Sequence, residues 1–303
     1  MSTTISQAFV KQFGDNISLL SQQMMSRTRG CVTEKMVRGD SATFERLGSE
    51  TLVEKVSRHT DTPIGDIAHS RRTVSLRTFH QAELLDNEDQ IKMLIDPRSD
   101  YARSLVAAAN RKIDDIVLDA AIGTAYSGVS GGTGVTLPAG QVIAAGGTAL
   151  TITKLREART LLAQANVDLD NDDLYLVVNG EGMEDLYAIT EFINRDYNMG
   201  SLNVDLSKIK PAGYLGDFLG FKIIHCERIT SLAGTYGGTL IATTARPAIA
   251  FTRSAIGLAI GEDIKTQISL RDDKNYAAQV YIEMTIGATR IHDDRVVDIR
   301  FAE

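Results

Sequence analysis

The sequence predicts a mixed α+β fold, and three observations support this class. A long stretch with helical apolar spacing follows Asp96-Pro97, a strand and then a helix occupy residues 174–189, and strand-like runs dominate after residue 194. No repeat of roughly 20 to 50 residues is apparent. The 303 residues leave room for one large or two interlocked domains with ample core.

The composition is that of a globular protein and excludes several classes of protein. Apolar residues make up 43% of the chain and charged residues 23%. No stretch reaches the roughly 18 uncharged apolar residues of a membrane helix, and the first residues lack a secretory signal pattern. Two cysteines, Cys31 and Cys226, are no disulfide framework. We expect a soluble protein of a reducing cytosol, with no membrane partner.

The formal net charge of -7 argues against a protein whose main task is to bind nucleic acid. Such domains carry a basic excess, because they release counterions from phosphate. Contact with DNA is therefore expected to be non-specific at most.

Residues 1–38 are expected to form a polar arm. Apolar side chains at positions 9, 13, 17, 20 and 24 have helical spacing, but the face is short. We interpret the segment as an arm that packs on another surface, with a neighbouring subunit as one candidate.

Residues 39–87 are predicted to form a long hairpin, with strands at Thr51–His59 and Arg71–His80 and a turn that contains Pro63 and Gly65. A hairpin alone buries too little apolar surface to be stable, so we expect it to rest on another surface. Its arms mix both charges, which suits salt-linked contact with another chain; an ordinary solvent-exposed hairpin remains the alternative. The charged residues are Glu45, Glu50, Glu54, Lys55, Arg58, Asp61, Asp66, Arg71, Arg72 and Arg77.

A long helix is predicted to begin at Asp96-Pro97 and to run to about Tyr126, about 45 Å at 1.5 Å per residue. Its apolar face contains Leu105, Ala109, Ile113 and Val117, and its charged residues, Asp114 among them, take other faces. Residues 123–149 are rich in glycine and predict a surface loop or short irregular strands. Further elements are predicted at Thr151–Ala165 (helix), Leu174–Val178 (strand), Glu181–Ile189 (helix), and strands at Phe221–Cys226, Thr239–Thr244, Ala248–Arg253, Ile264–Leu270, Ala277–Ile286 and Val296–Phe301.

Two motifs suggest chemistry but lack the context that it needs. Ser130 lies in a G-x-S-x-G pattern, yet a helix precedes it where the hydrolase nucleophile elbow has a strand. Asp168-x-Asp170-x-Asp172 resembles the start of a calcium loop, but Asp173 replaces the turn glycine and Asn179 replaces the bidentate glutamate. We interpret them as a flexible loop and a solvated turn.

Two pairs of possible metal ligands, each with one histidine, also fall short of a metal site. His225 and Cys226 are adjacent on a strand and point to opposite faces, and His292 with Asp294 lacks a third ligand nearby. No phosphate-binding glycine loop with its lysine is present. We therefore expect no catalytic, cofactor-binding or metal-binding residues, no cofactor and no enzyme activity; the pattern of arm, hairpin and long helix suits assembly.

In this order of parts, several stretches are similar to the major capsid protein of tailed bacteriophages, the Hong Kong ninety-seven type fold. The similar stretches are Leu174-Tyr-Leu-Val-Val-Asn-Gly-Glu-Gly-Met-Glu-Asp-Leu186, Gly213-Tyr-Leu-Gly-Asp-Phe-Leu-Gly-Phe-Lys-Ile-Ile-His225, Ala245-Arg-Pro-Ala-Ile-Ala-Phe251 and Gly287-Ala-Thr-Arg-Ile-His-Asp-Asp-Arg-Val-Val-Asp-Ile299. The resemblance covers almost the whole chain. It implies an N-terminal arm (1–38), an extended hairpin loop (39–87), a peripheral domain with a spine helix (88–126), an axial domain (127–240) and return strands of the peripheral domain (241–303).

The resemblance also implies partners and a location. The subunit would assemble with its own copies as pentamers and hexamers into an icosahedral shell around phage DNA, with a separate scaffolding protein, a portal protein and, in some relatives, a decoration or cement protein. The protein would be found in the virion after assembly in the host cytoplasm. Lys55 is the only hairpin lysine, and nothing assigns it a crosslinking role. An encapsulin-like bacterial compartment shell and a serine hydrolase using Ser130 are the alternative functions.

Overall fold

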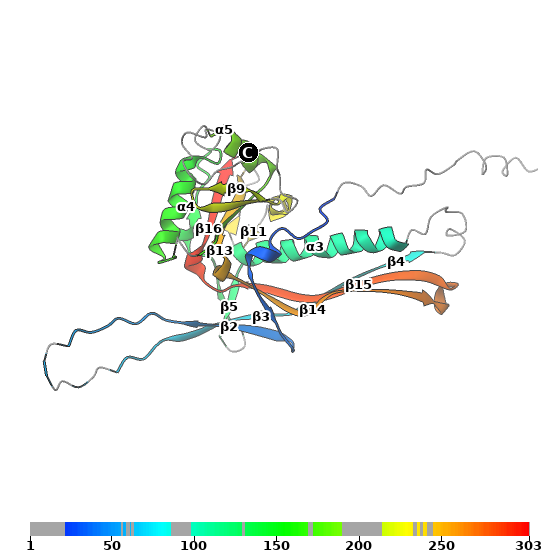
Figure 1. The fold of residues 1–303 in the computed structure, drawn as a ribbon, viewed down its shortest axis with the longest axis horizontal. Helices are drawn as coiled ribbons and strands as arrows, with labels where there is room; N and C mark the ends of the chain where they lie inside the picture. The colour runs from blue at the N-terminus through cyan, green and yellow to red at the C-terminus, as the bar shows by residue number, and fades with distance from the viewer. Residues whose placement is uncertain are drawn as a thin grey trace, which may run out of the picture. The chain divides into compact units, whose positions relative to one another are not determined.

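Figure 1 shows the chain in a computed structural model, which describes residues 22–55, 57–58, 61, 64–85, 98–128, 131–168, 172–189, 214–232, 235–236, 239–240 and 245–302. Helices and several sheets together confirm the predicted α+β class. The chain divides into two compact units. Unit 1 comprises Met1–Ser26, Arg77–Lys112 and Glu262–Ile286, and unit 2 comprises Arg27–Leu76, Ile113–Gly261 and Gly287–Glu303.

The elements of the described residues are as follows. The α-helices are α3 (Arg98–Ile122), α4 (Ile152–Gln164) and α5 (Gly180–Ala188). The strands are β1 (Thr33–Met36), β2 (Ser41–Leu47), β3 (His69–Ser75), β4 (Arg77–Leu85), β5 (Ala125–Ser127), β6 (Thr133–Val135), β7 (Val142–Ile143), β8 (Leu174–Val178), β9 (Tyr214–Phe218), β10 (Phe221–His225), β11 (Thr235–Tyr236), β12 (Thr239–Leu240), β13 (Ala245–Thr252), β14 (Ile256–Arg271), β15 (Ala277–Arg290) and β16 (Val296–Ala302). Short 3₁₀ turns lie at Arg29–Cys31, Ala139–Gln141, Glu227–Leu232, Arg253–Ala255, Asp272–Lys274 and Asp293–Arg295.

Unit 1 is a helix packed on a sheet. Strand β4 pairs antiparallel with β15, from Arg77 opposite Ile286 to Leu85 opposite Ala278. Every second residue of β15 from Ala278 to Ile286 is buried, as expected for a strand with one covered face. The first part of α3 lies against this sheet, because Leu105 and Ala108 line a groove with side chains of β4 and β15.

The core of unit 2 is a six-stranded mixed sheet in the order β7-β16-β13-β8-β10-β9. Central strand β8 is parallel to β10 and antiparallel to β13, and all five of its residues are buried. A strand covered on both faces has a continuous apolar run, which is why Leu174–Val178 could be predicted. Helix α4 packs Leu155, Ala158 and Leu162 against the sheet with no exposed surface.

Asn179 starts α5 directly after β8. Its side chain accepts a hydrogen bond from the backbone N–H of Gly182 at 2.9 Å, which satisfies one of the free amides at the helix start. The predicted helices at 151–165 and 181–189 and the strands corresponding to β8, β10, β13, β15 and β16 are confirmed within a few residues. The predicted strand at Ile264–Leu270 is part of the longer β14, and residues 241–244 of the strand predicted at Thr239–Thr244 lie outside the described residues.

The predicted hairpin is present, but its strands were placed wrongly. The outgoing strand is β2 and pairs antiparallel with β3, from Ser41 opposite Ser75 to Leu47 opposite His69. The described residues of the predicted strand Thr51–His59 lie in no strand. The return segment Arg71–His80 is two strands, β3 in unit 2 and β4 in unit 1, separated at Leu76. Thr51–His59 has strand-forming residues, but a strand also needs a partner for its backbone groups.

The spine helix is confirmed as α3 over Arg98–Ile122, while the predicted cap Asp96-Pro97 lies outside the described residues. Leu105, Ala109, Ile113 and Val117 are buried, as predicted. The helix ends at Ile122 instead of about Tyr126, because the chain enters β5 at Ala125.

One side chain of α3 contradicts the predicted polar face. Asp114 has no exposed surface. Its Oδ1 accepts hydrogen bonds from the backbone N–H of Arg27 and of Thr28, both at 3.0 Å, and from Thr28 Oγ1 at 2.8 Å. Asp114 therefore fixes residues 27 and 28 of the predicted arm, a role that the helical pattern alone did not indicate.

Residues 22–24 of the predicted arm contact α3 within unit 1. Asn110 Nδ2 donates to the backbone oxygen of Met24 at 2.9 Å, and Arg111 Nη1 donates to Gln22 Oε1 at 2.9 Å. The helical spacing predicted for positions 9 to 20 of the arm lies outside the described residues.

Candidate assembly interface

Beyond its base, the hairpin continues as a long loop. Among the described residues, the outermost backbone hydrogen bond between its arms runs from Gly48 N to Ala68 O at 2.8 Å. We call residues 48–68 the hairpin loop, and its described residues form neither helix nor strand. In Figure 1 the loop runs on beyond β2 and β3 as an open trace. Backbone groups that do not pair within a strand ladder can bind water or another chain.

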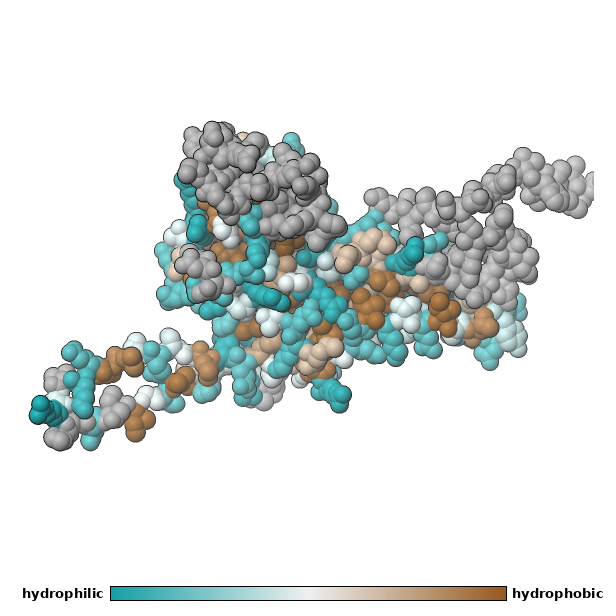
Figure 2. Space-filling model, in the orientation of Figure 1, coloured by the Kyte–Doolittle hydropathy of each residue, from teal (hydrophilic) through white to brown (hydrophobic). Residues whose placement is uncertain are grey.

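Apolar side chains on this loop have little cover from the described parts of the chain. Leu52 and Ile64 are fully exposed, and Val53 is 70% exposed. Figure 2 shows apolar side chains in brown alternating with hydrophilic ones along the hairpin. Single exposed apolar residues are ordinary on a protein surface, but a run of them on one slender loop indicates a surface for protein contact.

The base of the hairpin, in contrast, is supported by its own chain. Strand β3 pairs with β5, and β5 pairs with β6, so the hairpin belongs to a four-stranded sheet. Ala42, Phe44 and Val74 are buried in a cluster with Ala259 and Ile291. The hairpin base does rest on another surface, as expected, but this surface belongs to its own chain: strand β5 and the cluster with Ala259 and Ile291.

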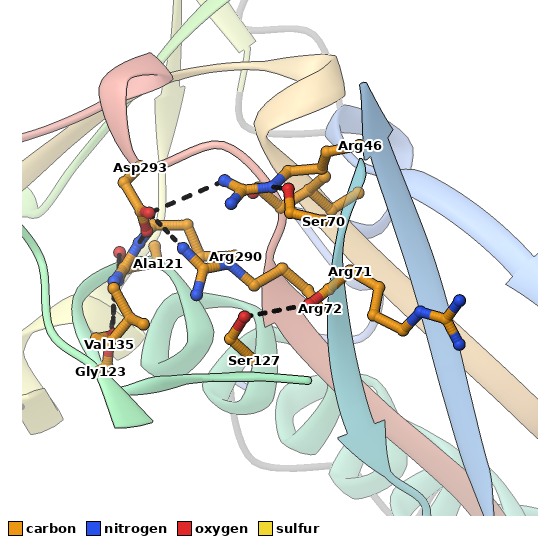
Figure 3. A network of polar contacts seen from close by, with 11 residues as sticks. Arg46, Ser70, Arg71, Arg72, Ala121, Gly123, Ser127, Val135, Arg290 and Asp293 are labelled. Carbon is orange, nitrogen blue, oxygen red and sulfur yellow. Dashed lines mark hydrogen bonds and ion pairs between the residues drawn. The ribbon is translucent and has the colours of Figure 1, made fainter. Parts of the chain in front are cut away.

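A buried charge network fixes the hairpin base, as Figure 3 shows. The carboxylate of Asp293 accepts a hydrogen bond from Arg290 Nε at 2.7 Å and a short one from Arg72 Nη2. Arg46 Nη1 lies 3.8 Å from the same carboxylate, and Arg46 Nε donates to Ser70 Oγ at 3.2 Å. Arg72, which we expected to contact another chain, is only 2% exposed and pairs within its own subunit.

Arg290 ties this network to the end of α3. Its Nη1 donates to the backbone oxygens of Ala121 at 3.0 Å and of Gly123 at 2.7 Å, and its Nη2 donates to Val135 O at 3.1 Å. The last carbonyls of a helix lack partners within the helix, so a cation there is stabilising. Burial lowers the pKa of Arg290, but a guanidinium remains charged in proteins.

The segment around the candidate nucleophile Ser130 lacks the context that catalysis needs. Ser130 lies outside the described residues, and its loop joins β5 and β6, which pair antiparallel. Gly128 and Gly131 have φ of 96° and 65°, values that glycine adopts readily. The loop therefore joins two strands of a hairpin, which is not the strand-to-helix turn that a hydrolase nucleophile requires.

The residues of the calcium-like segment have other partners. Asp172 lies 3.7 Å from Arg295, and Asp173 accepts a hydrogen bond from Lys222 at 2.5 Å, which lowers the pKa of Asp173. Asn179 is the cap of α5, and Asp170 lies outside the described residues. Among the residues that the structure describes, no group of three or more His, Cys, Asp or Glu side chains could hold a metal ion.

The structure also shows the surroundings of the two candidate ligand pairs, His225 with Cys226 and His292 with Asp294. His225 is partly exposed and lies 3.4 Å from Glu227, whereas Cys226 is buried. His292 is half-buried, and burial lowers its pKa. Asp294 is exposed, and so is Lys55 on the hairpin loop.

None of the helices within the described ranges is long and apolar enough to cross a membrane.

Comparison with known proteins agrees with this arrangement. The family model for phage capsid proteins matches residues 5–303. The capsid protein of Cyanophage P-SCSP1u is 17% identical, with a TM-score of 0.71 over 100% of this chain and 96% of that chain. That of Cyanophage Pam1 is 13% identical, with a TM-score of 0.68 over 100% and 98%, and that of Ralstonia phage GP4 is 13% identical, with a TM-score of 0.66 over 97% and 95%. No curated protein sequence matches significantly.

The hairpin, the long helix and the mixed sheets follow one another in the order that was expected for a shell-forming structural protein. The match across almost its full length shows that this chain belongs to the phage capsid protein family. It is a capsid shell subunit that associates with its own copies and is a component of the virion, and the predicted Hong Kong ninety-seven type fold is confirmed. Neither an encapsulin-like compartment nor a serine hydrolase is supported by these matches.

Proposed function

We propose that the subunit assembles as pentamers and hexamers into a closed icosahedral shell around phage DNA, with its hairpin loop lying across a neighbouring copy. The observation that carries this proposal is the exposure of Leu52, Val53 and Ile64 on a loop whose base is rigidly held. Apolar side chains that are exposed in one subunit gain free energy when a second subunit covers them. A fixed base also lowers the entropy lost when the loop docks.

The division of the chain remains part of this proposal. We assign residues 1–38 to an N-terminal arm, 39–87 to the extended hairpin, 88–126 and 241–303 to a peripheral domain, and 127–240 to an axial domain that meets its copies around the five- and six-fold axes. The contacts of each subunit would be modest and would be repeated by closed symmetry. The acidic net charge of -7 suits a wall that does not bind the packaged DNA tightly.

We also propose the partners and the place of assembly. A separate scaffolding protein would guide the shell, a portal protein would occupy one vertex, and a decoration or cement protein is a further partner in this class of shells. Assembly would take place in the host cytoplasm, and the subunit would have a structural role without catalysis. These partners rest on the family membership.

Electron microscopy of the purified subunit, alone and with its scaffold, tests this function. We expect closed shells or capsomers, and the mass of the particle gives its copy number. In parallel, Leu52→Asp should lower the yield of particles while leaving the folded subunit intact, because Leu52 makes no buried contact within the described part of its own subunit. A compact monomer under every condition would contradict the proposal.

A further inference from the structure

One buried guanidinium at the hairpin base has donors without acceptors. Arg72 is 2% exposed, and its Nη2 donates to the carboxylate of Asp293. Nε and Nη1 of Arg72 are buried and have no hydrogen-bond partner within the part of the chain that the structure describes. Buried donors in folded proteins are paired with the protein, with ordered water or with an ion, because an unpaired charged donor costs free energy.

The shape of the guanidinium shows that the acceptor on Nη2 does not serve the other two nitrogens of Arg72. Nε and Nη2 share one edge of the planar group, and Nη1 and Nη2 share the next edge. The carboxylate oxygen of Asp293 covers one of these edges at most, so the other edge faces a different partner. Arg290, in contrast, has an acceptor for every nitrogen, since Nε donates to Asp293 and both Nη atoms donate to backbone oxygens.

The buried charges of this network do not balance. Arg46 and Arg72 both approach Oδ2 of Asp293, Arg46 at 3.8 Å, while Arg290 pairs with Oδ1. The next carboxylate, Asp294, is exposed, so water screens its charge. Burial, and next the charge of Arg72, lower the pKa of Arg46. Three guanidinium groups thus share one partly buried carboxylate, and arginine does not relieve the excess by losing its proton.

We propose that the hairpin base binds one small monovalent anion, of the size of chloride, which accepts hydrogen bonds from the free edge of Arg72 beside the guanidinium of Arg46. Such an ion satisfies the donors of Arg72 and also lowers the net positive charge of the cluster. Ordered water would accept the same hydrogen bonds but would leave the charge unchanged. Phosphate or sulfate has more oxygens to satisfy than Arg72 has free donors.

The anion would join the two strands of the hairpin base, because Arg46 lies on β2 and Arg72 lies on β3. The site belongs to a single subunit, so this inference does not depend on how copies assemble. An ion that binds the folded state alone stabilises it by mass action. The free energy of unfolding should therefore depend on the concentration of the anion.

Urea unfolding of the isolated subunit, with chloride replacing gluconate at constant ionic strength, tests the site. Gluconate is too large for a buried site of this kind. Above the dissociation constant, every tenfold rise in chloride should raise the folding equilibrium constant about tenfold, and Arg72→Met should abolish this dependence. Arg71→Met is the matched control and should keep it: the Arg71 side chain is 44% exposed, lies 3.8 Å from Glu45 and points away from Asp293 in Figure 3.

Bromide gives a readout that needs no variant. In crystals of the wild-type subunit grown with bromide, anomalous scattering should place one ion within hydrogen-bond distance of Nε or Nη1 of Arg72. A water molecule at this place, or bromide found only elsewhere, overturns the proposal. So does equal stability of the wild type in chloride and in gluconate, or a chloride dependence that persists in Arg72→Met. If Arg72→Met does not fold, the wild-type titration and the bromide position decide.

Discussion

At the scale of single residues, Lys154 shows how one side chain joins distant segments. The residue is 7% exposed, and its ammonium donates to four backbone oxygens at 2.9 to 3.1 Å. Three of these acceptors belong to the loop before α4, and the fourth is Arg300 in β16; the acceptors are Ala145, Thr148, Ala149 and Arg300. Lys154 therefore fixes the glycine-rich loop to strand β16 of the main sheet.

Lys154→Met should destabilise the subunit. Methionine keeps the apolar stem but leaves several buried carbonyls without a donor, which costs about 1 to 3 kcal/mol each when water cannot replace it. Urea unfolding of the isolated subunit measures the loss. Lys222→Met is the matched control: its side chain is 38% exposed and pairs with Asp173, so its loss should be below about 1 kcal/mol. Equal losses for the two variants would contradict the role of Lys154.

Asp298 makes stability depend on pH. It has no exposed surface, and burial raises its pKa above the ordinary value of 3.8, although Arg300 Nε donates to it at 2.9 Å. The folded state therefore holds the proton more tightly than the unfolded state. This contribution to stability is fully present below the ordinary pKa and is lost as the pH rises through the raised one.

Asp298→Asn, which is neutral at every pH, should therefore gain stability relative to the wild type as the pH rises from about 4 to about 7. The free energy of unfolding of both proteins at several pH values in this range measures the difference. A difference that stays constant, or that changes in the opposite direction, would contradict the raised pKa.

The sequence could not predict these residue-scale contacts. Asp114 was placed on a charged face because a helical pattern reports only the spacing of apolar residues, and the pattern gave Lys154 no role at all. Most of their partners are backbone groups, at Thr28 and Arg300 for example, that lie far away in the chain. Any residue type offers the same backbone oxygen or N–H, so no side-chain pattern marks such a partner.

At the scale of elements, the charge network decides how firmly the hairpin is held. Asp293→Asn removes the carboxylate that Arg290 and Arg72 share, and Arg72 is 2% exposed. Loss of one partner from a buried ion pair costs about 3 to 5 kcal/mol, because the remaining charges stay buried without compensation. We expect a lower midpoint in thermal unfolding and faster hydrogen exchange in β2 and β3.

The neighbouring carboxylate offers a matched control for this prediction. Asp294 is exposed, so Asp294→Asn removes the same charge from the same turn without uncovering a buried guanidinium. Its stability should stay within about 0.5 kcal/mol of the wild type. If both variants unfold alike, net charge and not the network explains the effect.

Elements with a clear apolar period could be predicted, and those that depend on pairing could not. Apolar residues recur with helical spacing in α3 and α4 and form a continuous run in β8. These patterns predicted the positions of the three elements. In the hairpin, Thr51–His59 has strand-forming residues, but the pairing ends at Leu47 opposite His69. Strand propensity cannot place the point at which two arms separate, since that depends on the surface beneath them.

At the scale of the whole molecule, the order of elements was enough to predict a shell subunit, while the contact surface needed coordinates. Leu52 and Ile64 become notable only because both are fully exposed, and Phe44 only because it is buried at the hairpin base. Apolar residues occur both on the loop and at the hairpin base, so the sequence alone does not distinguish the two parts. Burial within the subunit therefore divides the hairpin into a part that stabilises its own fold and a part left for a neighbour.

Burial within the subunit also predicts how the two thiols react. Cys31 and Cys226 are buried within the subunit, and burial raises the pKa of each to about 12, with the nearby Asp114 adding to the effect. Only the thiolate reacts with disulfide reagents, and at pH 8 such a thiol is ionised to about one part in ten thousand. Both should react about a thousandfold more slowly than a free cysteine.

A disulfide reagent with a coloured product measures this rate in free subunits and in shells. We expect the same slow reaction in both, because each thiol is covered by its own chain, and two rapidly reacting thiols per chain once urea unfolds the protein. Thr266→Cys on the exposed part of β14 should add one thiol that reacts at once in free subunits. If the native thiols react quickly in free subunits and slowly only in shells, then a neighbour and not the subunit's own core covers them, and the closed core derived for each subunit is wrong.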